Sequence, residues 1–357
     1  MGSKGILVLA DGTVYQGKLS GRLAPVTVGE LVFNTSMAGG QEILTDPGHA
    51  GQLVVMTYPL LGTYEDNPLK AESKGVCAQG IVVKELRKPK QFSSYQPAVP
   101  VLTGIDTRAL TRHLHQFGSM PAAIGPAADC TVTELLDKIA ETPSYDQINW
   151  VKEVTCSQPT FYAPTRSKGH IAIVDLGLKN SILEAFLAQG YAVSVFPANV
   201  DVKEILRLDV DGVILSNGPG NPRLQEGPIT LVRNLVGKVP IFGICLGQLI
   251  IALALGGQTT KLKLGHHGMN QSVRALKTNK ILITMQNHGY AVEEESLVGT
   301  GLYVTHRNLN DGTIEGLAHQ YLPVAGVQYQ PELSFGFQDA ASLFSQFWHE
   351  KGQAKAG

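Results

Sequence analysis

The segment VPIFGICLG, residues 239–247, decides how the second half of this chain folds. A short apolar run of strand length leads into Cys245, which lies between Gly243 and Gly247, and an apolar run of helical length follows. A nucleophile on a sharp turn from strand to helix leaves no room for side chains two residues away on either side. The pattern therefore predicts a strand, a tight turn that presents Cys245, and a helix.

The wider segment, residues 239–257, is almost wholly apolar and about long enough to cross a bilayer. Its four glycines and Pro240 divide it into pieces that are too short for a single spanning helix. We interpret it as a buried strand followed by a buried helix of about two to three turns. No membrane partner is expected.

Regular alternation of strand-like and helix-like segments leads up to this turn, from HIAIVDLG, which begins at residue 170, to VPIFGIC. Such alternation indicates βαβ units and a parallel sheet, with catalytic groups at the carboxyl ends of its strands. The sequence predicts an α/β protein with a C-terminal parallel-sheet domain at 169–357. A mixed α/β domain is predicted at 1–151. Residues 152–168, rich in Pro, Ser, Thr and Lys, are predicted to be a linker.

Cys245 has two interpretations from the residues alone. A single cysteine after a buried strand is commonly inert core, whereas the flanking glycines and the following helix N-terminus favour a reactive thiolate. A second glycine-rich strand end, SNGPGNP at 216–222, supplies a turn whose amides at Gly218 and Gly220 suit an oxyanion. The amide of Leu246 would complete the oxyanion hole, although SNGPGNP alone is more typical of a plain turn.

Composition limits the class of partner. The chain has 357 residues, 43% of them hydrophobic and 17% charged, and a net charge of −1. Such a balance predicts no nucleic-acid partner and favours a small molecule or a protein. The four cysteines are far apart and form no CxxC pair, so neither a metal site nor a disulfide framework is expected, and a reducing cytoplasm fits best.

At this point the motifs carry a resemblance. The second half resembles a class I, triad-type glutamine amidotransferase, and the whole chain resembles the small subunit of carbamoyl-phosphate synthetase. The motifs in the first half are LADGTVYQG, GELVFNTSMAGGQEILTDPGHAGQLVVMTYPLLG and GIDTRALTRHL. Those in the second half are IVDLGLKNSILEAF, LSNGPGNP, FGICLG, KLKLGHHGMNQ, MQNHGYAVEEESL and THRNLNDGTIEGL.

The resemblance implies a function. In the family the cysteine of GICLG attacks the side-chain amide of L-glutamine, and the ammonia released travels to a large subunit that makes carbamoyl phosphate from bicarbonate. ATP and Mg belong to that large subunit, and no cofactor is expected in this chain. Cys245 takes the place of the nucleophile. The implied glutamine-binding positions are Gly48, Gly218, Gly220, Leu246, Leu249, Asn287, Gly289 and Tyr290.

The end of the family pattern, V-Q-F-H-P-E, is changed in this sequence. Residues 327–332 read VQYQPE, so Glu332 is present but Gln330 stands where the triad histidine belongs. An amide has no useful pKa near neutrality and cannot take the thiol proton or protonate departing ammonia. We therefore expect impaired glutaminase activity.

Other glutamine-facing positions are changed as well. Gln248 and Leu249 replace the histidine and glutamine of CLGHQ, and Gly48 replaces the serine of TDPSY. Gly40 replaces the tyrosine of T-G-Y-Q-E. The remaining candidates for a base in the C-terminal domain match family positions with other purposes or lie in a turn: His266, His267, His288, His306 and His319.

Three hypotheses follow. The chain is a slow glutamine-hydrolysing subunit, or a non-catalytic pseudo-amidotransferase that supports an ammonia-using large subunit, or an enzyme that forms the Cys245 thioester but does not release it. All three share the fold and the partner. Arginine and pyrimidine biosynthesis are both open as the destination of the product.

Overall fold

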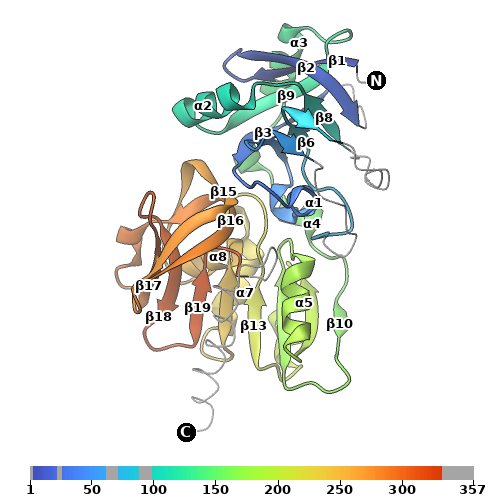
Figure 1. The fold of residues 1–357 in the computed structure, drawn as a ribbon. Coiled ribbons are helices and arrows are strands. Elements are labelled where there is room, and N and C mark those ends of the chain that lie inside the picture. The colour runs from blue at the N-terminus through green and yellow to red at the C-terminus, as the bar shows by residue number, and fades with distance from the viewer. Residues whose placement is uncertain (1–2, 22–25, 62–70, 88–98, 332–357) are drawn as a thin grey trace. The chain divides into compact units, whose positions relative to one another are not determined.

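A computed structural model describes residues 3–21, 26–61, 71–87 and 99–331, and Figure 1 shows the course of the chain. The chain forms two compact units. The first unit comprises residues 1–148 together with 263–268, and the second comprises 149–262 together with 269–357. Each is described by itself below.

A closed β-barrel, with strand order β1-β2-β8-β6-β4-β3-β9, forms the first unit. In the sequence, the Asp-Gly pair at 11–12 between two short apolar runs predicts a β-hairpin, and the structure confirms it: β1 and β2 pair antiparallel, and Gly12 takes the positive φ of 86° that this turn requires. The barrel strands are β1 (Ser3–Leu9), β2 (Val14–Gly21), β3 (Thr27–Asn34), β4 (Gln52–Met56), β6 (Gly80–Val82), β8 (Pro100–Thr103) and β9 (Met120–Pro126). Two short strands, β5 (Leu60–Leu61) and β7 (Glu85–Leu86), pair separately.

The helices of the first unit are α1 (Gly40–Thr45), α2 (Thr107–Phe117) and α3 (Val132–Glu141), with 3₁₀ helices η1 (Pro47–His49) and η3 (Tyr145–Gln147). Helix α2 begins where the Asp106 side chain accepts the Ala109 amide at 2.9 Å. Leu110 and Leu114 of this helix are buried in the barrel core. Phe117 shares their spacing but is exposed, because the helix ends there and Gly118 follows.

The second unit is built on a ten-stranded sheet of order β10-β12-β11-β13-β14-β19-β18-β17-β15-β16. Its middle strands, from β12 to β19, are parallel, and antiparallel strands flank them. The strands are β10 (Thr160–Tyr162), β11 (His170–Asp175), β12 (Ala192–Pro197), β13 (Gly212–Leu215), β14 (Ile241–Ile244), β15 (Thr259–Ala275), β16 (Lys280–Val292), β17 (Leu302–Asn308), β18 (Ile314–His319) and β19 (Val324–Val327). The sheet is therefore mixed, and the sequence predicted only its parallel part.

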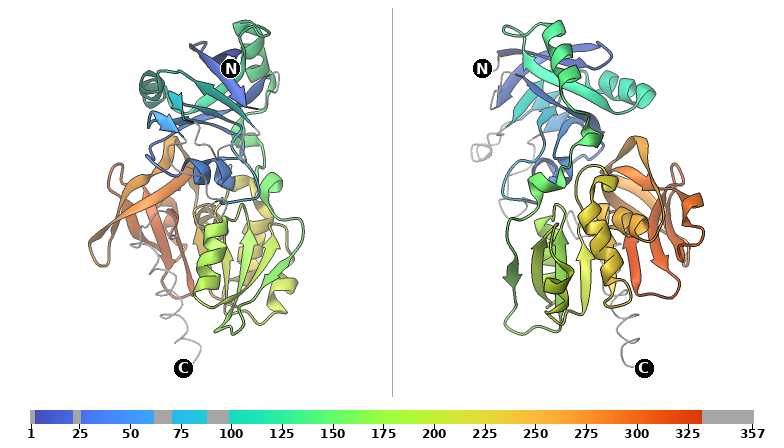
Figure 2. Two further views of the ribbon diagram at one scale, coloured as in Figure 1. Left: turned by 45° about the vertical axis from the view of Figure 1, so that its right-hand side comes forward. Right: turned by 180° about the vertical axis from the view of Figure 1, so that it is seen from behind.

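Helices cover both faces of the parallel strands, as the opposite views in Figure 2 show. On one face, strand residues such as Val174 and Leu215 pack with α6, α7 and α8, and on the other, Ile173 and Ile214 pack with α5. The bounds are α4 (Val151–Val154), α5 (Asn180–Ala188), α6 (Val202–Leu206), α7 (Glu226–Leu235) and α8 (Leu246–Ala254), with 3₁₀ helices η4 (Pro222–Leu224) and η5 (Glu294–Leu297). Burial on both faces explains the continuous apolar strands of the sequence.

The predicted linker, residues 152–168, is part of the second unit and contains strand β10. Its start is held by side chains that composition does not reveal. Asp175, at the end of β11, accepts the amide of Cys156 at 2.8 Å, and its backbone carbonyl accepts the Thr155 hydroxyl at 2.6 Å. The other carboxylate oxygen of Asp175 accepts the amides of Gly177 and Leu178. One buried carboxylate thus fixes both the incoming segment and the loop after β11.

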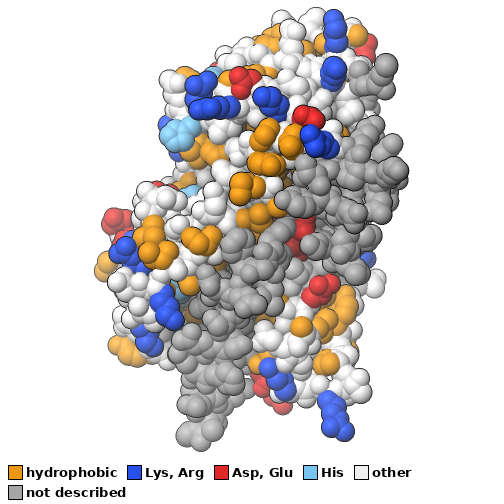
Figure 3. Space-filling model, in the orientation of Figure 1, with side chains coloured by type: hydrophobic (Ala, Val, Ile, Leu, Met, Phe, Trp, Pro, Cys, Tyr) orange, Lys and Arg blue, Asp and Glu red, His pale blue; other side chains and the backbone are white. Residues whose placement is uncertain are grey.

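The surface charges and the lengths of the helices are relevant to the predictions about nucleic-acid and membrane partners. On the face drawn in Figure 3, Lys and Arg side chains occur among Asp and Glu on each unit, without a field of one sign. Among the described residues no helix is both long and apolar enough to cross a membrane. The apolar segment at 239–257 is divided between β14 and α8, as its glycines predicted.

Replacement of Asp175 by asparagine tests this anchor. The asparagine side chain would keep one acceptor oxygen but turn an NH₂ group toward a backbone amide, so we expect the free energy of unfolding to fall by about 1–3 kcal/mol. Urea unfolding followed by circular dichroism measures the change. The control is Glu204→Gln on exposed α6, expected to stay within about 0.5 kcal/mol. Equal stability of the two variants would contradict the role of Asp175.

Candidate active site around Cys245

Cys245 occupies a strained turn between β14 and α8. Its φ of 53° and ψ of −106° lie in a region that L-residues rarely adopt. A Cβ atom on Gly243 would stand 2.5 Å from the Gln248 amide nitrogen, and one on Gly247 would stand 2.2 Å from the Leu215 carbonyl oxygen. Only glycine fits at either position, and the turn predicted from GICLG is confirmed.

The contacts of the Cys245 thiol include one group on β16 and one from the residue after β19, and Cys245 is 1% exposed. The Sγ atom lies 3.5 Å from the carbonyl oxygen of Asn287 on β16, and the Nε2 atom of Gln328, just after β19, lies 3.7 Å from Sγ. The backbone amide of Cys245 donates to Val327 at 2.8 Å. Strands β13, β14 and β19 are adjacent and parallel, so their carboxyl ends bring residues 216–218, Cys245 and Gln328 to one edge of the sheet.

The loop after β13 packs against the start of α8. A Cβ atom on Gly218 would stand 2.9 Å from the Leu246 side chain and 2.1 Å from the Leu176 carbonyl oxygen, and Gly220 has a φ of 86°. The first amides of α8 that bond to Cys245 are those of Gln248 and Leu249. The amides of Leu246 and Gly247 precede them and have no acceptor within the helix. This is the setting that an oxyanion requires.

The side chain of Gln330 is bound to Lys179. Its Oε1 atom accepts a hydrogen bond from the buried ammonium of Lys179 at 3.0 Å, and its backbone amide donates to Met285 on β16 at 2.9 Å. Its Nε2 atom is buried and makes no hydrogen bond within the part of the chain that the structure describes. The carboxamide therefore donates nothing to the thiol. Glu332, the expected partner of this position, lies outside the described residues.

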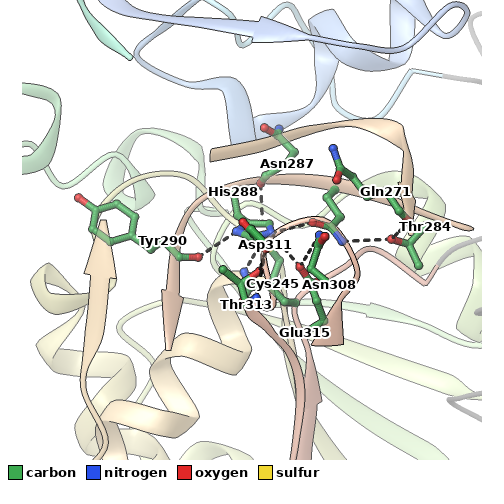
Figure 4. Close-up of polar contacts among 12 residues, drawn as sticks. Cys245, Gln271, Thr284, Asn287, His288, Tyr290, Asn308, Asp311, Thr313 and Glu315 are labelled. Carbon is green, nitrogen blue, oxygen red and sulfur yellow. Dashed lines mark hydrogen bonds and ion pairs between the residues drawn. The ribbon is translucent and has the colours of Figure 1, made fainter. Parts of the chain in front are cut away.

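His288, the histidine next to Asn287, is held by its own strand. Its Nδ1 atom is 2.9 Å from the Tyr290 carbonyl oxygen and its Nε2 atom is 3.0 Å from the Gln286 side chain. Figure 4 shows this network continuing to Glu315, whose carboxylate is 4.0 Å from Nε2. With both ring nitrogens engaged, His288 is positioned as a structural residue.

Two other candidate histidines of the second unit, His306 and His319, are engaged with other groups. His306 packs edge-on against Tyr329 and bonds Thr305, and burial lowers the pKa of its imidazole to about 4. The Nδ1 atom of His319 accepts the amides of Tyr321 and Leu322 in the turn before β19. His266 and His267 belong to the first unit.

The remaining predicted glutamine contacts are placed as follows. Leu249 and Tyr290 are buried together in one apolar cluster, so the position of the family glutamine is now part of a core. Gly289 lies between His288 and Tyr290 on β16, where a Cβ atom would meet nothing within 4 Å. Gly48 lies in η1 of the first unit, where its amide donates to Asp46.

Sequence reasoning missed three residues of this site. Lys179 in GLKN is a residue type that is almost never fully buried without a partner, and Gln328 follows an apolar strand without any motif of its own. Asn217 is 1% exposed, and neither polar atom of its side chain has a hydrogen-bond partner among the described residues. A usable signal for Asn217 and Gln328 was their place at the ends of parallel strands.

Comparison with known proteins identifies the family. A family model for the CPSase domain of the carbamoyl-phosphate synthase small chain matches residues 7–124, and one for class-I glutamine amidotransferase matches residues 172–350. The chain is 43% identical over 353 residues to the carbamoyl phosphate synthase small chain of Caldanaerobacter subterraneus, covering 96% of this chain and 95% of the relative. The chain belongs to the carbamoyl-phosphate synthase small chain family.

Further relatives agree along the same length. Identity is 44% over 366 residues to the carbamoyl phosphate synthase small chain of Syntrophotalea carbinolica, a match that covers 96% of both chains. It is 43% over 351 residues to the pyrimidine-specific small chain of Halalkalibacterium halodurans, with 96% of this chain and 95% of the relative covered. The resemblance drawn from the motifs is confirmed, and the family is one of glutamine amidotransferases.

Gly247→Ala tests the strained turn. The added methyl group would overlap backbone atoms of β13 that cannot move independently, so we expect a loss of about 3 kcal/mol or more in unfolding free energy. Thermal and urea unfolding measure it. Gly227→Ala on α7 is the matched control, since a Cβ atom there meets nothing within 4 Å, and it is expected to be neutral or slightly stabilising. A stable Gly247→Ala chain would contradict the steric argument.

Proposed function

We propose that this chain acts as the small subunit of a two-subunit carbamoyl-phosphate synthase whose own glutaminase activity is strongly impaired. The observation that carries the proposal is Gln330, whose carboxamide is bound to Lys179 at the position of the triad base. The partner would be the large subunit, which would use ATP, Mg and bicarbonate, and L-glutamine would be the substrate of this chain. The site is assigned to Cys245, with the amides of Gly218, Gly220 and Leu246 around the oxyanion.

The chemistry explains the impairment. Attack by Sγ on the glutamine amide needs a thiolate, and collapse of the tetrahedral intermediate needs a proton on the departing nitrogen. Gln330 can neither remove the thiol proton nor protonate the departing nitrogen, because a carboxamide does not titrate near neutrality. In hydrolases that use a nucleophile and base of a catalytic triad, loss of the base lowers turnover by about ten-thousand- to million-fold. Leu249 stands where the resemblance expects a glutamine side chain, so a polar contact to the substrate L-glutamine is also removed.

A second candidate function is a pseudo-amidotransferase that binds the large subunit while free ammonia feeds synthesis. The packing of Leu249 with Tyr290 in an apolar core favours it, because the altered position 249 is built into the fold. In this second function the chain has a structural or regulatory role and Cys245 is not turned over. The two functions differ only in whether glutamine is hydrolysed.

Glutaminase assays of the purified chain separate them, with and without the large subunit. A small residual turnover that Cys245→Ala abolishes would support the impaired subunit, and turnover equal to that of Cys245→Ala would support the pseudo-amidotransferase. Gln330→His should raise turnover at least about tenfold if the base is the main deficiency. Gln330→His combined with Leu249→Gln is the companion variant if glutamine binding also limits. Ordinary turnover in the unchanged chain, abolished by Cys245→Ala, would refute the impairment.

Assembly provides an independent prediction. Carbamoyl-phosphate formation by the two-subunit complex should proceed with ammonium salts and fall to a small fraction of that rate with glutamine alone. Cys245→Ala should leave the ammonium-dependent rate and the association with the large subunit unchanged, since it alters only a buried thiol. Failure of the chain to bind a large subunit by analytical ultracentrifugation would contradict the proposed role.

The trapped-thioester hypothesis has its own measurement. Intact-mass spectrometry of the chain after incubation with glutamine would reveal an acyl adduct that is missing in Cys245→Ala. Its detection would mean that attack succeeds and release fails.

A further inference from the structure

Two glutamines outside the triad position form a chain of hydrogen bonds to the thiol. Gln328 Nε2 lies 3.7 Å from the Sγ atom of Cys245, and Gln248 Nε2 donates to Gln328 Oε1 at 3.0 Å. Both glutamines are completely buried. They come from different elements, since Gln248 is in the first turn of α8 and Gln328 follows β19.

The order of donors in this chain sets its effect on sulfur. A carboxamide has one acceptor end and one donor end. Because Gln248 donates to the oxygen of Gln328, the NH₂ group of Gln328 is the end that faces Sγ. A hydrogen bond donated to sulfur stabilises the thiolate relative to the thiol. With the opposite orientation the Gln328 oxygen would face sulfur and would favour the thiol instead.

We propose that Gln328 stabilises the thiolate of Cys245 through its carboxamide N–H, and that Gln248 is the positioning residue that keeps this N–H turned toward sulfur. The inference rests on the proposed function, because it concerns the same nucleophile. On ionisation the S–H bond breaks, the electron pair stays on sulfur and the proton passes to water. The site can thus form its thiolate nucleophile without a histidine. Neither glutamine can protonate the departing ammonia.

The neighbouring titratable groups on the packed elements do not substitute for this pair. Lys179 donates to Gln330, and His288 on β16 has both ring nitrogens engaged. Tyr329, beside Gln328, packs in the same cluster as Cys245, and burial raises the pKa of its hydroxyl, so it stays neutral. The carbonyl oxygen of Asn287 accepts from the thiol and favours the protonated form.

Ultraviolet titration of the thiolate tests the proposal without any need for glutamine turnover. The signal of Cys245 is the difference between each chain and the same chain carrying Cys245→Ala. The subtraction removes the contributions of the other thiols, of which burial raises the pKa of Cys77 and Cys130 and burial beside Asp175 raises the pKa of Cys156 to about 12.

The expected results are specific to each variant. Gln328→Met and Gln328→Leu should both raise the titration midpoint of Cys245 by about one pH unit, because a donor to the charged form is lost. Gln248→Leu should raise it less, since Gln328 remains but can turn. Gln248→His should keep the midpoint, because an imidazole N–H can donate to Gln328 Oε1. Circular dichroism of each variant confirms that it is folded.

Two results would overturn the inference. An unchanged or lowered midpoint in both Gln328 variants would show that its N–H does not stabilise the thiolate. A full effect in Gln328→Met with none in Gln248→Leu would remove the positioning role of Gln248. Ordinary glutaminase turnover would defeat the proposed impairment but would leave these midpoints unaffected, so the two failures are distinguishable.

Discussion

The site depends on a steric constraint at the turn from β14 to α8. Cys245 holds a positive φ there, and neither Gly243 nor Gly247 has room for a Cβ atom. Because the turn is so tight, helix α8 starts directly behind the thiol and packs on β13. The same closeness places the amides at the start of α8 beside the glycine-rich loop at Gly218. The turn thus positions the thiol against the Asn287 carbonyl oxygen and the Gln328 side chain.

This constraint also explains why the scaffold survives changes in the catalytic groups. The glycines, the parallel strands and the apolar faces determine the fold, and none of them requires a titratable group at residue 330. Lys179 donates to the side-chain oxygen of Gln330, and the backbone amide of Gln330 donates to Met285 on β16, while its buried Nε2 atom has no hydrogen-bond partner among the described residues. The bonds that Gln330 makes with Lys179 and Met285 therefore do not require a titratable side chain at this position.

The sequence was informative where local sterics or periodicity decide the structure. The β1–β2 hairpin followed from Asp11-Gly12, the turn at Cys245 from its glycines, and the alternating elements from β11 to α8 from apolar runs. It was uninformative where a single long-range hydrogen bond decides. The segment after Val151 reads as a linker because nothing local shows that Asp175 accepts its amide. Lys179 reads as a surface residue because its burial arises only when the loop after β11 meets β16 and Gln330.

The contact between Lys179 and Gln330 has an evolutionary consequence. An imidazole offers one acceptor nitrogen to an ammonium, and the amide oxygen of glutamine offers an acceptor of similar reach. An exchange of histidine and glutamine at residue 330 would thus keep an acceptor for Lys179, and selection for folding alone would act on it only weakly. The codons of these two amino acids differ only in the third base, so a single mutation exchanges a titratable side chain for a carboxamide here and keeps an acceptor for Lys179.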